Sequence, residues 1–383
     1  MKNKKQHYVS KLYMKNFTND NIFNVLNLKT GQVILNVPYE SQCYCNYYYG
    51  KDNYWEKILG KYESSWNVLF KKIIAEERFC LNKKENELIK QFAVIQSSRV
   101  PNSEKVLKMT YWKILKEALT MEMKANNISI NDSIMSGAKK YLYDNYLQVP
   151  AKENLDLSHD FTIEIEDLSV CIIEYDCKND LISSDNPVIK YNGFTRFNIG
   201  WGMAGFSCFF PINSKKIAVI YDEKMYPELK NNHYYVSRNE NEVHAINEFI
   251  MISSGSIVFF QNEKNKKNVE KYYKNNIENR KKYIESMQPK IFGQENDKYI
   301  CFSEPQIPID YNFRFVKLIQ RAKRFQMPEL EAFPRIKTNE YIQRMKMRKI
   351  ISNNSVTRKM YKINNKKLNQ FNHFVNDYWG NFL

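Results

Sequence analysis

The chain has 383 residues, which is long enough for two domains or for one large domain with an appendage. Its hydrophobic content of 43% excludes a disordered chain, and its 11 glycines and 11 prolines exclude a fibrous or low-complexity protein. The formal net charge of +16 is concentrated late in the chain: residues 261–383 carry a net charge of +14, and the first 260 residues carry +2. A codon bias toward lysine would spread along the whole chain, so this asymmetry predicts a distinct basic C-terminal region.

Three features predict a cytoplasmic protein that does not enter a membrane. No segment approaches 18 uninterrupted apolar residues, the length of a membrane-spanning helix. The first residues lead into polar His7 and Ser10 instead of the apolar stretch of a signal peptide. The seven cysteines are an odd number and scattered, which is typical of a reducing compartment.

The N-terminal segment is predicted to form a short helix and a β-hairpin. The helix is expected at residues 10–17. Alternating apolar and polar residues at 22–28 and 33–37 flank the turn Lys29-Thr-Gly31, which is the pattern of two antiparallel strands joined by a tight connection.

A helical layer is predicted over about residues 50–148. Apolar residues recur there at the 3.6-residue spacing of a helix in four successive segments. In the third segment, Leu107, Tyr111 and Ile114 are expected to face inward. The four helices are expected at residues 54–77, 85–99, 103–124 and 133–146.

Strand patterns dominate from about residue 160 to residue 260 and predict a mostly antiparallel sheet. Some runs alternate strictly, as in Phe161-Thr-Ile-Glu-Ile-Glu166, and one helical pattern interrupts them near residues 242–252. Helices first and strands later indicate an α+β fold rather than repeated βαβ units. Residues 1–260 are therefore expected to form one α+β body. The expected strands are 161–166, 168–175, 181–187, 206–211, 216–221 and 256–260.

The region 261–383 is predicted to be basic, mainly helical and separate from the body. A highly charged helix is expected at residues 262–287, with a thin apolar stripe that includes Tyr273 and Ile277. Two more helices are expected, around 313–325 and 339–351. A terminal helix should dock on the body through an apolar face made of Leu368, Phe371, Val375, Tyr378 and Trp379.

Several short motifs occur in the order in which they occur in a known family. The segment His7-Tyr-Val-Ser-Lys-Leu-Tyr-Met-Lys-Asn-Phe17 is similar to that family's opening pattern of His-Tyr-Val/Ile-Pro, Tyr-Leu and Phe. Over about residues 5–262 the chain resembles the bacterial family catalogued as domain of unknown function 4238. The further motifs are Glu56 and Glu63, Gln96-Ser-Ser-Arg-Val-Pro101, Leu181-Ile-Ser-Ser-Asp-Asn-Pro-Val188, Phe210-Pro-Ile-Asn-Ser214, and Asn247.

The resemblance implies a bacterial protein, but it assigns no catalytic residue because the family's activity is uncharacterised. Ser10 stands where the family usually has proline, and Val100 stands where threonine is common. Neither difference touches an ionisable group. Family members resemble proteins of prophages and genome islands, which favours a role in anti-phage defence or toxicity.

Two pairs of polar residues fall within these motifs. Glu56 and Glu63 are two helical turns apart and so share one helix face. Gln96 and Arg99 are neighbours on the next helix. The spacing fits an interhelical ion pair, and it equally fits a site in which Glu63 is a general base or metal ligand and Arg99 binds an anion.

Asp185 and His7 complete the candidate catalytic set, which also contains Glu63 and Arg99. Asp185 ends an apolar strand, where many α+β enzymes place a metal ligand, but Ser-Asp-Asn-Pro is equally an ordinary turn sequence. His7 is a candidate general acid or base, with an ordinary near-terminal histidine as the alternative. The carboxylates of Asp185 and Glu63 are the oxygen ligands that Mg²⁺ or Mn²⁺ would require.

Other kinds of site are excluded because their motifs are absent. The sequence has no Gly-x-x-x-x-Gly-Lys phosphate loop and no Gly-x-Gly-x-x-Gly, so it shows no motif for a nucleotide cofactor. It has no zinc-protease histidine pair and no Cys-x-x-Cys, so it shows no zinc motif. The nucleophile elbow Gly-x-Ser-x-Gly is also absent.

The basic region contains the candidate nucleic-acid contacts. Between residues 341 and 376 there are nine lysines and arginines and no acidic residue. This pattern predicts contact with the phosphate backbone of RNA or DNA, while a solvated helix surface or attachment to an acidic protein partner would produce the same pattern. The candidate contacts are Arg344, Lys346, Arg348, Lys349 and Arg358.

Two functions from different classes remain open. The leading hypothesis is a nucleic-acid-directed effector, in particular a nuclease dependent on a divalent metal. The rival is a non-catalytic module that binds nucleic acid or protein and whose Glu–Arg pairs are structural. The two differ in space: an enzyme requires His7, Glu63, Arg99 and Asp185 to converge in one open cleft, and a binding module allows them to be buried as closed pairs.

Overall fold

The computed structural model describes most of the body and a single residue of the last 82. The described residues are 4–77, 79–129, 131–193, 200–226, 229, 233–287, 290–292, 299–301 and 335. The helices expected around 313–325 and 339–351 and the apolar face of Leu368–Trp379 lie outside them. Those expectations, and the division into domains 1–260 and 261–383, stay predictions.

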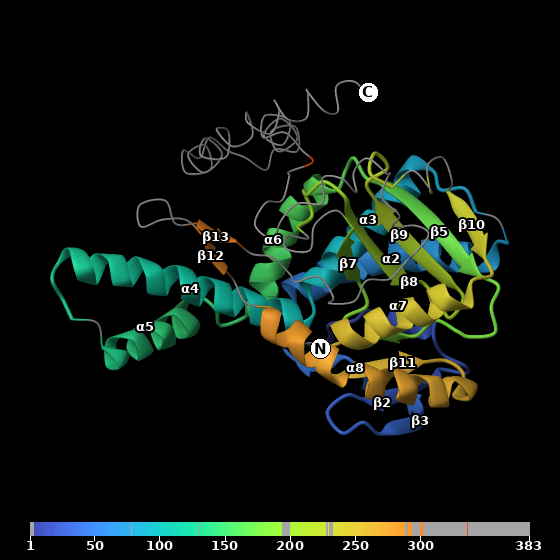
Figure 1. The fold of residues 1–383 in the computed structure, drawn as a ribbon, viewed down its shortest axis with the longest axis horizontal. Coiled ribbons are helices and arrows are strands. Elements are labelled where there is room, and N and C mark those ends of the chain that lie inside the picture. The colour runs from blue at the N-terminus through green and yellow to red at the C-terminus, as the bar shows by residue number, and fades with distance from the viewer. Residues whose placement is uncertain are drawn as a thin grey trace.

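Eight α-helices occur in the described part of the chain (Figure 1). Those predicted in the first 150 residues and the charged helix beyond residue 260 are present with ends within a few residues of the expected ones. The bounds are α1 Lys11–Lys15, α2 Tyr54–Ala75, α3 Lys83–Ser98, α4 Pro101–Ala125, α5 Asp132–Asn145, α6 Pro150–Glu164, α7 Glu240–Ser253 and α8 Lys266–Ser286.

Two larger sheets contain most of the described strands. One has five strands in the order β10-β5-β9-β8-β7, and the other has four in the order β3-β2-β11-β6. Every pair of neighbours is antiparallel except β10 and β5. The α+β class and the mostly antiparallel sheet are thereby confirmed. The bounds are β2 Ile22–Asn27, β3 Val33–Pro38, β5 Ser169–Tyr175, β6 Ser183–Ser184, β7 Ile189–Asn192, β8 Phe206–Pro211, β9 Lys216–Tyr221, β10 Tyr234–Ser237 and β11 Ile257–Phe260.

Two short pairs of strands lie outside these sheets. β1 (Lys5–His7) pairs antiparallel with β4 (Tyr44–Asn46), and β12 (Lys290–Phe292) pairs antiparallel with β13 (Tyr299–Cys301). The first pair holds the opening motif of the chain beside the aromatic segment at 44–49. That pairing positions the backbone carbonyls of His7 and Tyr8, which the candidate site uses.

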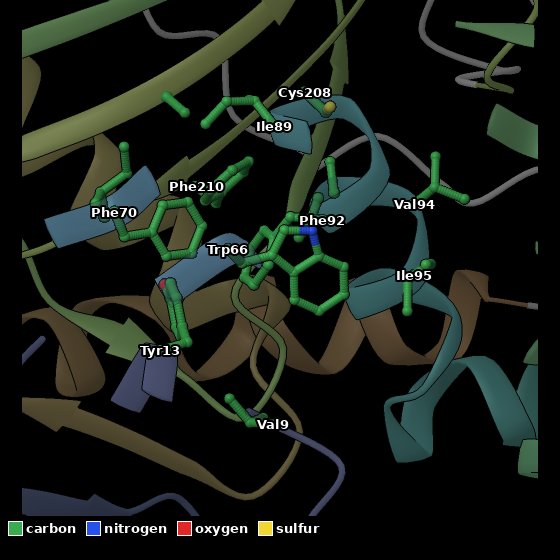
Figure 2. Close-up of a cluster of buried hydrophobic side chains, with 14 of the residues drawn as sticks. Val9, Tyr13, Trp66, Phe70, Ile89, Phe92, Val94, Ile95, Cys208 and Phe210 are labelled. Atoms are coloured by element: carbon green, nitrogen blue, oxygen red, sulfur yellow. The ribbon is translucent and has the colours of Figure 1, made fainter. Parts of the chain in front are cut away.

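The five-stranded sheet is covered on both faces. Every residue of β8 and β9 is buried, so successive side chains, which point to opposite faces, meet apolar layers on both sides. On one face Phe210 contacts Phe92 of α3 at a ring-centroid distance of 4.8 Å, and Phe92 meets Trp66 of α2 edge to face at 5.2 Å (Figure 2). On the other face Phe209 packs against Phe249 of α7. Helices therefore enclose the sheet as two outer layers.

The prediction of a strand at residues 161–166 is wrong, because residues 161–164 form the last turn of helix α6 and the chain then enters a turn. Three apolar residues at alternate positions fit a strand, but they also fit the end of a helix that has begun upstream. Pro150 at the first helical position starts α6, and Leu155 and Ile163 of this helix are fully buried. The upstream helix therefore decides the structure of this segment.

Helices α4 and α5 project from the body as an arm (Figure 1). Leu107, two turns into α4, packs with Leu142 and Leu147 in a small cluster. Tyr111 and Ile114 are 36% and 44% exposed, so the prediction that they face inward is wrong. At about 1.5 Å per residue, the 25 residues of α4 extend well past the body. The helical layer on the sheet is formed by α2 and α3.

Helix α8 packs on α7 and belongs to the compact unit. Its buried residues include Val269, Tyr272 and Tyr283, which join the core on the α7 side of the sheet. Val269 of the predicted stripe is buried, but farther along the helix the buried face is displaced by one residue, since Ile277 is exposed and Asn276 is buried. The side chain of Tyr273 instead lies over Gly31, where any Cβ would come within 2.8 Å of the ring. The buried residues from Val269 to Met287 therefore pack against the core on the α7 side of the sheet.

Among the residues that the structure describes, no helix is both long enough and apolar enough to cross a bilayer.

Candidate functional site

Arg99 is the centre of the cluster that the opening motif forms with α2 and α3. It caps α3, which ends there because Pro101 restricts the preceding residue to extended backbone. The side chain is 1% exposed, and its Nη2 atom lies 2.8 Å from Oε1 of Glu63 on α2. Nη2 also donates to the carbonyl of His7 at 2.9 Å, and Nε donates to the carbonyl of Tyr8 at 3.1 Å. One guanidinium thus joins two helices and the first strand.

The surrounding charges hold this arginine in its ionised form. Burial by itself would lower the pKa of the Arg99 guanidinium, but Tyr49, Glu63 and Glu56 outweigh burial and raise it. Both glutamates therefore act on Arg99, and Glu63 forms an interhelical ion pair with it. A catalytic role of Glu63 and Arg99 stays a prediction.

Gln96 reinforces the same attachment. Its Nε2 atom donates to the carbonyl of Tyr8 at 2.9 Å, and its Oε1 atom accepts from the backbone of Ser10 at 3.4 Å. Gln96 and Arg99 are one helical turn apart on α3, so together they fix the backbone from His7 to Ser10. Both side chains donate to backbone carbonyls of the opening motif.

His7 lies at the edge of this cluster. Its Nε2 atom is 3.1 Å from the carbonyl of Glu40, and its ring is tilted against Tyr44 at a centroid distance of 5.5 Å. Burial, followed by the positive charges of Lys11 and Arg99, lowers the pKa of His7, although the contact with Glu40 opposes this shift. The histidine is therefore neutral near pH 7, with its ring in contact with protein groups.

The lowered pKa of His7 predicts a pH dependence of stability. The unfolded chain takes up a proton near the ordinary value of about 6.5, and the folded chain takes it up only at lower pH. The free energy of unfolding should therefore fall as the pH falls from 7 through 6.5, by at most about 1.4 kcal/mol per pH unit for one proton. His7→Gln, which can still donate to Glu40, should make this slope shallower in urea titrations at pH 5–7.5. The exposed His233 supplies the control, because His233→Gln should keep the slope; a slope unchanged by His7→Gln would contradict the prediction.

Asp185 is enclosed by backbone amides of a different segment. It follows β6, is 2% exposed, and accepts hydrogen bonds from the N–H groups of Gly255 at 2.7 Å, Ser256 at 2.6 Å and Ile257 at 3.4 Å. Burial raises the pKa of its carboxyl, and these three bonds and the charge of Arg280 oppose that shift. The carboxylate thereby closes the connection between α7 and β11.

This connection is shaped to receive the carboxylate. A Cβ atom at Gly255 would lie 2.7 Å from Oδ2 of Asp185, so only glycine allows the approach. The guanidinium of Arg280 in α8 also binds this connection, because it donates to the carbonyls of Met251, Ser254 and Gly255. The acceptors of Asp185 and the donors of Arg280 therefore satisfy the backbone of one tight loop.

The structure brings His7, Glu63 and Arg99 together and directs Asp185 elsewhere. The charge of Asp185 does contribute, after burial, to raising the pKa of Tyr8, so the two networks are neighbours. Their carboxylates nonetheless bind different partners. Among the residues that the structure describes, no three His, Cys, Asp or Glu side chains are grouped so that they could hold a metal ion. Metal binding by Asp185 and Glu63 stays a prediction.

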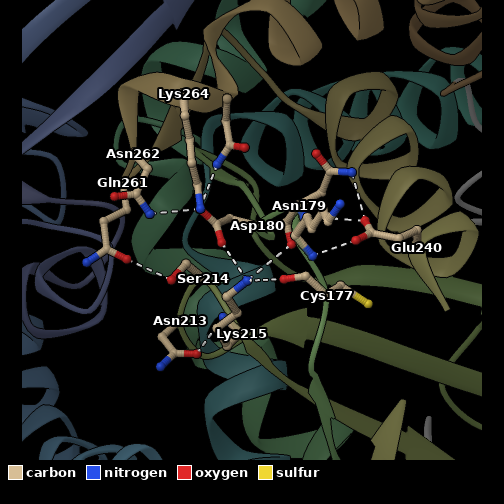
Figure 3. A network of polar contacts seen from close by, with 12 residues as sticks. Cys177, Asn179, Asp180, Asn213, Ser214, Lys215, Glu240, Gln261, Asn262 and Lys264 are labelled. Atoms are coloured by element: carbon tan, nitrogen blue, oxygen red, sulfur yellow. Dashed lines mark hydrogen bonds and ion pairs between the residues drawn. The ribbon is translucent and has the colours of Figure 1, made fainter. Parts of the chain in front are cut away.

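A buried network around Asp180 was missed by sequence reasoning (Figure 3). The carboxylate lies 2.8 Å from Nζ of Lys215 and accepts from the amides of Asn262 at 2.7 Å and Asn265 at 2.8 Å. Burial opposes these contacts, but they lower the pKa of Asp180. Asn247, one of the family-like motif residues, donates to the carbonyl of Asp180 at 2.9 Å. The network joins α7, β9 and the start of α8, and its members are too far apart in sequence to form a motif.

Lys216 is a second residue that the sequence did not reveal. It is 5% exposed and donates to the carbonyls of Ile73 at 2.8 Å and Glu76 at 2.6 Å. These carbonyls end helix α2, where a cation satisfies the unpaired acceptors and the helix dipole. The side chain therefore attaches α2 to β9.

The predicted nucleic-acid contacts Arg344, Lys346, Arg348, Lys349 and Arg358 lie outside the described residues. The described part of the basic region contains α8, and five of its lysines are exposed. We refer to these as the α8 lysine face, which consists of Lys267, Lys271, Lys274, Lys281 and Lys282.

Comparison with known proteins identifies the family to which the chain is similar. The model of the family described as Protein of unknown function (DUF4238) matches residues 5–264, which include His7, Glu63, Arg99 and Asp185. No curated protein and no solved structure is significantly similar to the chain.

Proposed function

The chain belongs to the DUF4238 family, and because the function of that family is unknown, we propose from the chain's own residues that it is a nucleic-acid-binding protein. In this proposal the phosphates of RNA or DNA are bound by the α8 lysine face and by the basic residues that follow it in the chain. The Glu63–Arg99 pair and Asp185 are structural. The later basic residues are Arg344, Lys346, Arg348, Lys349 and Arg358.

The observation that carries the proposal is the arrangement of the α8 lysine face. Its members are separated by four, three, seven and one residues, so at 100° per residue they fall within one side of the helix. From Lys267 to Lys282 the face extends about 22 Å along the helix axis, which spans several phosphates of a nucleic acid. Glu278 and Glu285 are exposed on the same side, so the face has a net charge of +3.

The closed state of the two carboxylate networks supports a binding function over a catalytic one. Glu63 is paired with a buried arginine, and Asp185 is surrounded by three backbone donors. A metal ligand or general base must present a lone pair to a metal or substrate. Both oxygens of Asp185 already accept hydrogen bonds within the protein, and Oε1 of Glu63 is engaged by Arg99.

A cytoplasmic location and a role in anti-phage defence or toxicity are further parts of the proposal. The first is supported by six cysteines that are unpaired in the structure, namely Cys43, Cys45, Cys80, Cys171, Cys177 and Cys208. The second is supported by the family resemblance alone.

Reversing three charges of the α8 lysine face should weaken nucleic-acid binding and its dependence on salt. Each phosphate contact contributes about 0.9 to the slope of log affinity against log salt on duplex DNA and about 0.7 on single strands. Lys267→Glu/Lys271→Glu/Lys274→Glu should therefore lower that slope by about 2 to 3. Fluorescence anisotropy with labelled duplex DNA, single-stranded DNA and RNA, at 50–300 mM salt, measures both quantities.

The matched control is a triple reversal in α2, at Lys57, Lys61 and Lys71. These lysines are also exposed on a helix, and the change in net charge is the same. The control should keep the salt slope of the unmodified protein. Equal weakening by both triple variants would show a general charge effect and contradict the proposed surface. Absence of binding to all three nucleic acids at 50 mM salt would contradict the function and favour the acidic protein partner.

A further inference from the structure

Arg335 is the described residue of the last 82, and its side chain is inserted into the body. The side chain is 6% exposed. Its Nε atom donates to Oδ2 of Asp167 at 2.8 Å, and its Nη1 atom donates to the carbonyl of Met203 at 2.9 Å. Its Nη2 atom donates to the carbonyls of Glu164 and of Trp201, the latter at 3.1 Å. All three guanidinium nitrogens therefore have acceptors that are provided by the body.

The backbone at this position is held as well. The amide of Arg335 donates to the carbonyl of Gly202 at 2.7 Å. Main chain and side chain thus bind the same loop, Trp201 to Met203, which leads into β8. The indole of Trp201 keeps this loop in place: it is 5% exposed, and its ring lies 5.1 Å from that of Phe206.

The acceptors around Arg335 suit a planar cation. They surround the guanidinium at its edge, in different directions, and one carboxylate lies within reach of two of its nitrogens. A guanidinium has five N–H donors in a fixed plane, whereas the ammonium of lysine has three donors on one atom and cannot reach acceptors spread in this way.

The electrostatics of this position require a positive charge. The carbonyl of Glu164 ends helix α6, and the last turn of α6 contains no basic residue, so its dipole is not compensated locally. Asp167 lies directly beyond that end. Asp222, 4% exposed, is stabilised by the charge of Arg335 in addition to its own bonds from the amides of Gly205 and Lys224. Lys90 is the nearby like charge, and its ammonium donates to the carbonyl of Glu166.

We propose that Asp167 and the carbonyls of Glu164, Trp201 and Met203 form a guanidinium-binding socket, which Arg335 occupies and which attaches the C-terminal region to the body. The attachment joins segments 168 residues apart in the chain. It also limits the reach of the basic residues beyond it, because Arg344 follows nine residues later and can lie at most about 30 Å from the socket. The inference concerns attachment and does not depend on what the basic region binds.

Arg335→Ala in the full-length chain tests the socket through stability and amide exchange. The variant should lower the melting temperature by about 4 °C or more. The backbone amide at residue 335, which donates to Gly202 in the unmodified protein, should exchange at least about tenfold faster in hydrogen–deuterium exchange. Arg238→Ala is the matched control, because Arg238 also pairs with an aspartate, Asp176, through Nε at 2.9 Å but is 82% exposed. The control should change neither quantity.

Chemical rescue tests the specificity for a guanidinium. Ethylguanidinium at 10 mM should restore at least half of the melting temperature lost in Arg335→Ala, ethylammonium should not, and Arg335→Lys should behave as Arg335→Ala does. Unchanged melting and exchange in Arg335→Ala, or full stability in Arg335→Lys, would overturn the proposal. If Arg335→Ala yields no folded protein, Asp167→Asn provides the test, and an amide exchange at residue 335 equal to that of the unmodified protein would then overturn it. None of these measurements includes nucleic acid, so their failure leaves the proposed function untouched.

Discussion

Replacing Arg99 by methionine should lower the free energy of unfolding by about 3–5 kcal/mol, the range expected when one partner of a buried ion pair is removed. The variant leaves Glu63 without its cation, and it leaves the carbonyls of His7 and Tyr8 without donors that lie at 2.9 and 3.1 Å in the unmodified protein. Urea denaturation followed by circular dichroism measures the change as a lower midpoint at a constant m-value.

The controls separate a structural arginine from a functional one. Arg238→Met removes an exposed arginine from its pair with Asp176 and should cost less than about 1 kcal/mol. In the double variant Arg99→Met/Glu63→Gln, the loss of unfolding free energy should be smaller than the sum of the two single losses. Each single variant leaves the other residue without its ion-pair partner, and the double variant does not. Full stability in Arg99→Met together with loss of nucleic-acid binding or cleavage would identify Arg99 as a functional residue instead.

Asp185→Asn should also destabilise the fold, by about 2 kcal/mol, because hydrogen bonds to a charged acceptor are lost. The amide keeps one oxygen, so at least one of the N–H groups of Gly255 and Ser256 would face the amide nitrogen and lose its acceptor. The burial that raises the pKa of the carboxyl offsets part of the loss, since the uncharged amide is easier to bury. Thermal melts and urea titrations at pH 7 measure the effect, with the exposed Asp176→Asn as the control.

The same variants decide whether the chain is a metal-dependent nuclease. Labelled DNA and RNA would be incubated with the unmodified protein in Mg²⁺, in Mn²⁺ and in chelator. From the closed networks we expect any cleavage to be independent of the metal and to decline in Asp185→Asn and Glu63→Gln only as far as the folded fraction declines. Metal-dependent cleavage that disappears in a variant with unchanged melting would assign that carboxylate to an active site and replace the proposed binding function.

Local patterns were sufficient for those elements whose formation depends on neighbouring residues. The hairpin of β2 and β3 follows from alternation and a turn at Gly31, and α2 follows from a stripe that places Trp55, Leu59 and Trp66 on one face. The same reasoning placed Glu56 and Glu63 on one helix face and Gln96 beside Arg99 on the next helix, because residues seven apart or three apart share a side of a helix. Where two periods fit the same few residues, as at 161–166, the local pattern could not decide.

The partners of the buried polar groups were decided by tertiary structure. The sequence fits Asp185 as a metal ligand or as an ordinary turn residue, and it gives no sign of the three donors, which come from residues about 70 positions later in the chain. Lys216 and Arg335 look like surface cations in the sequence. In the structure their side chains donate to carbonyls at the C-terminal ends of helices α2 and α6, which lie 140 and 171 residues away in the chain. A charged side chain has no intrinsic preference among distant acceptors. Its partner is set by which backbone groups the packed helices and sheets leave unpaired, and that depends on the whole fold.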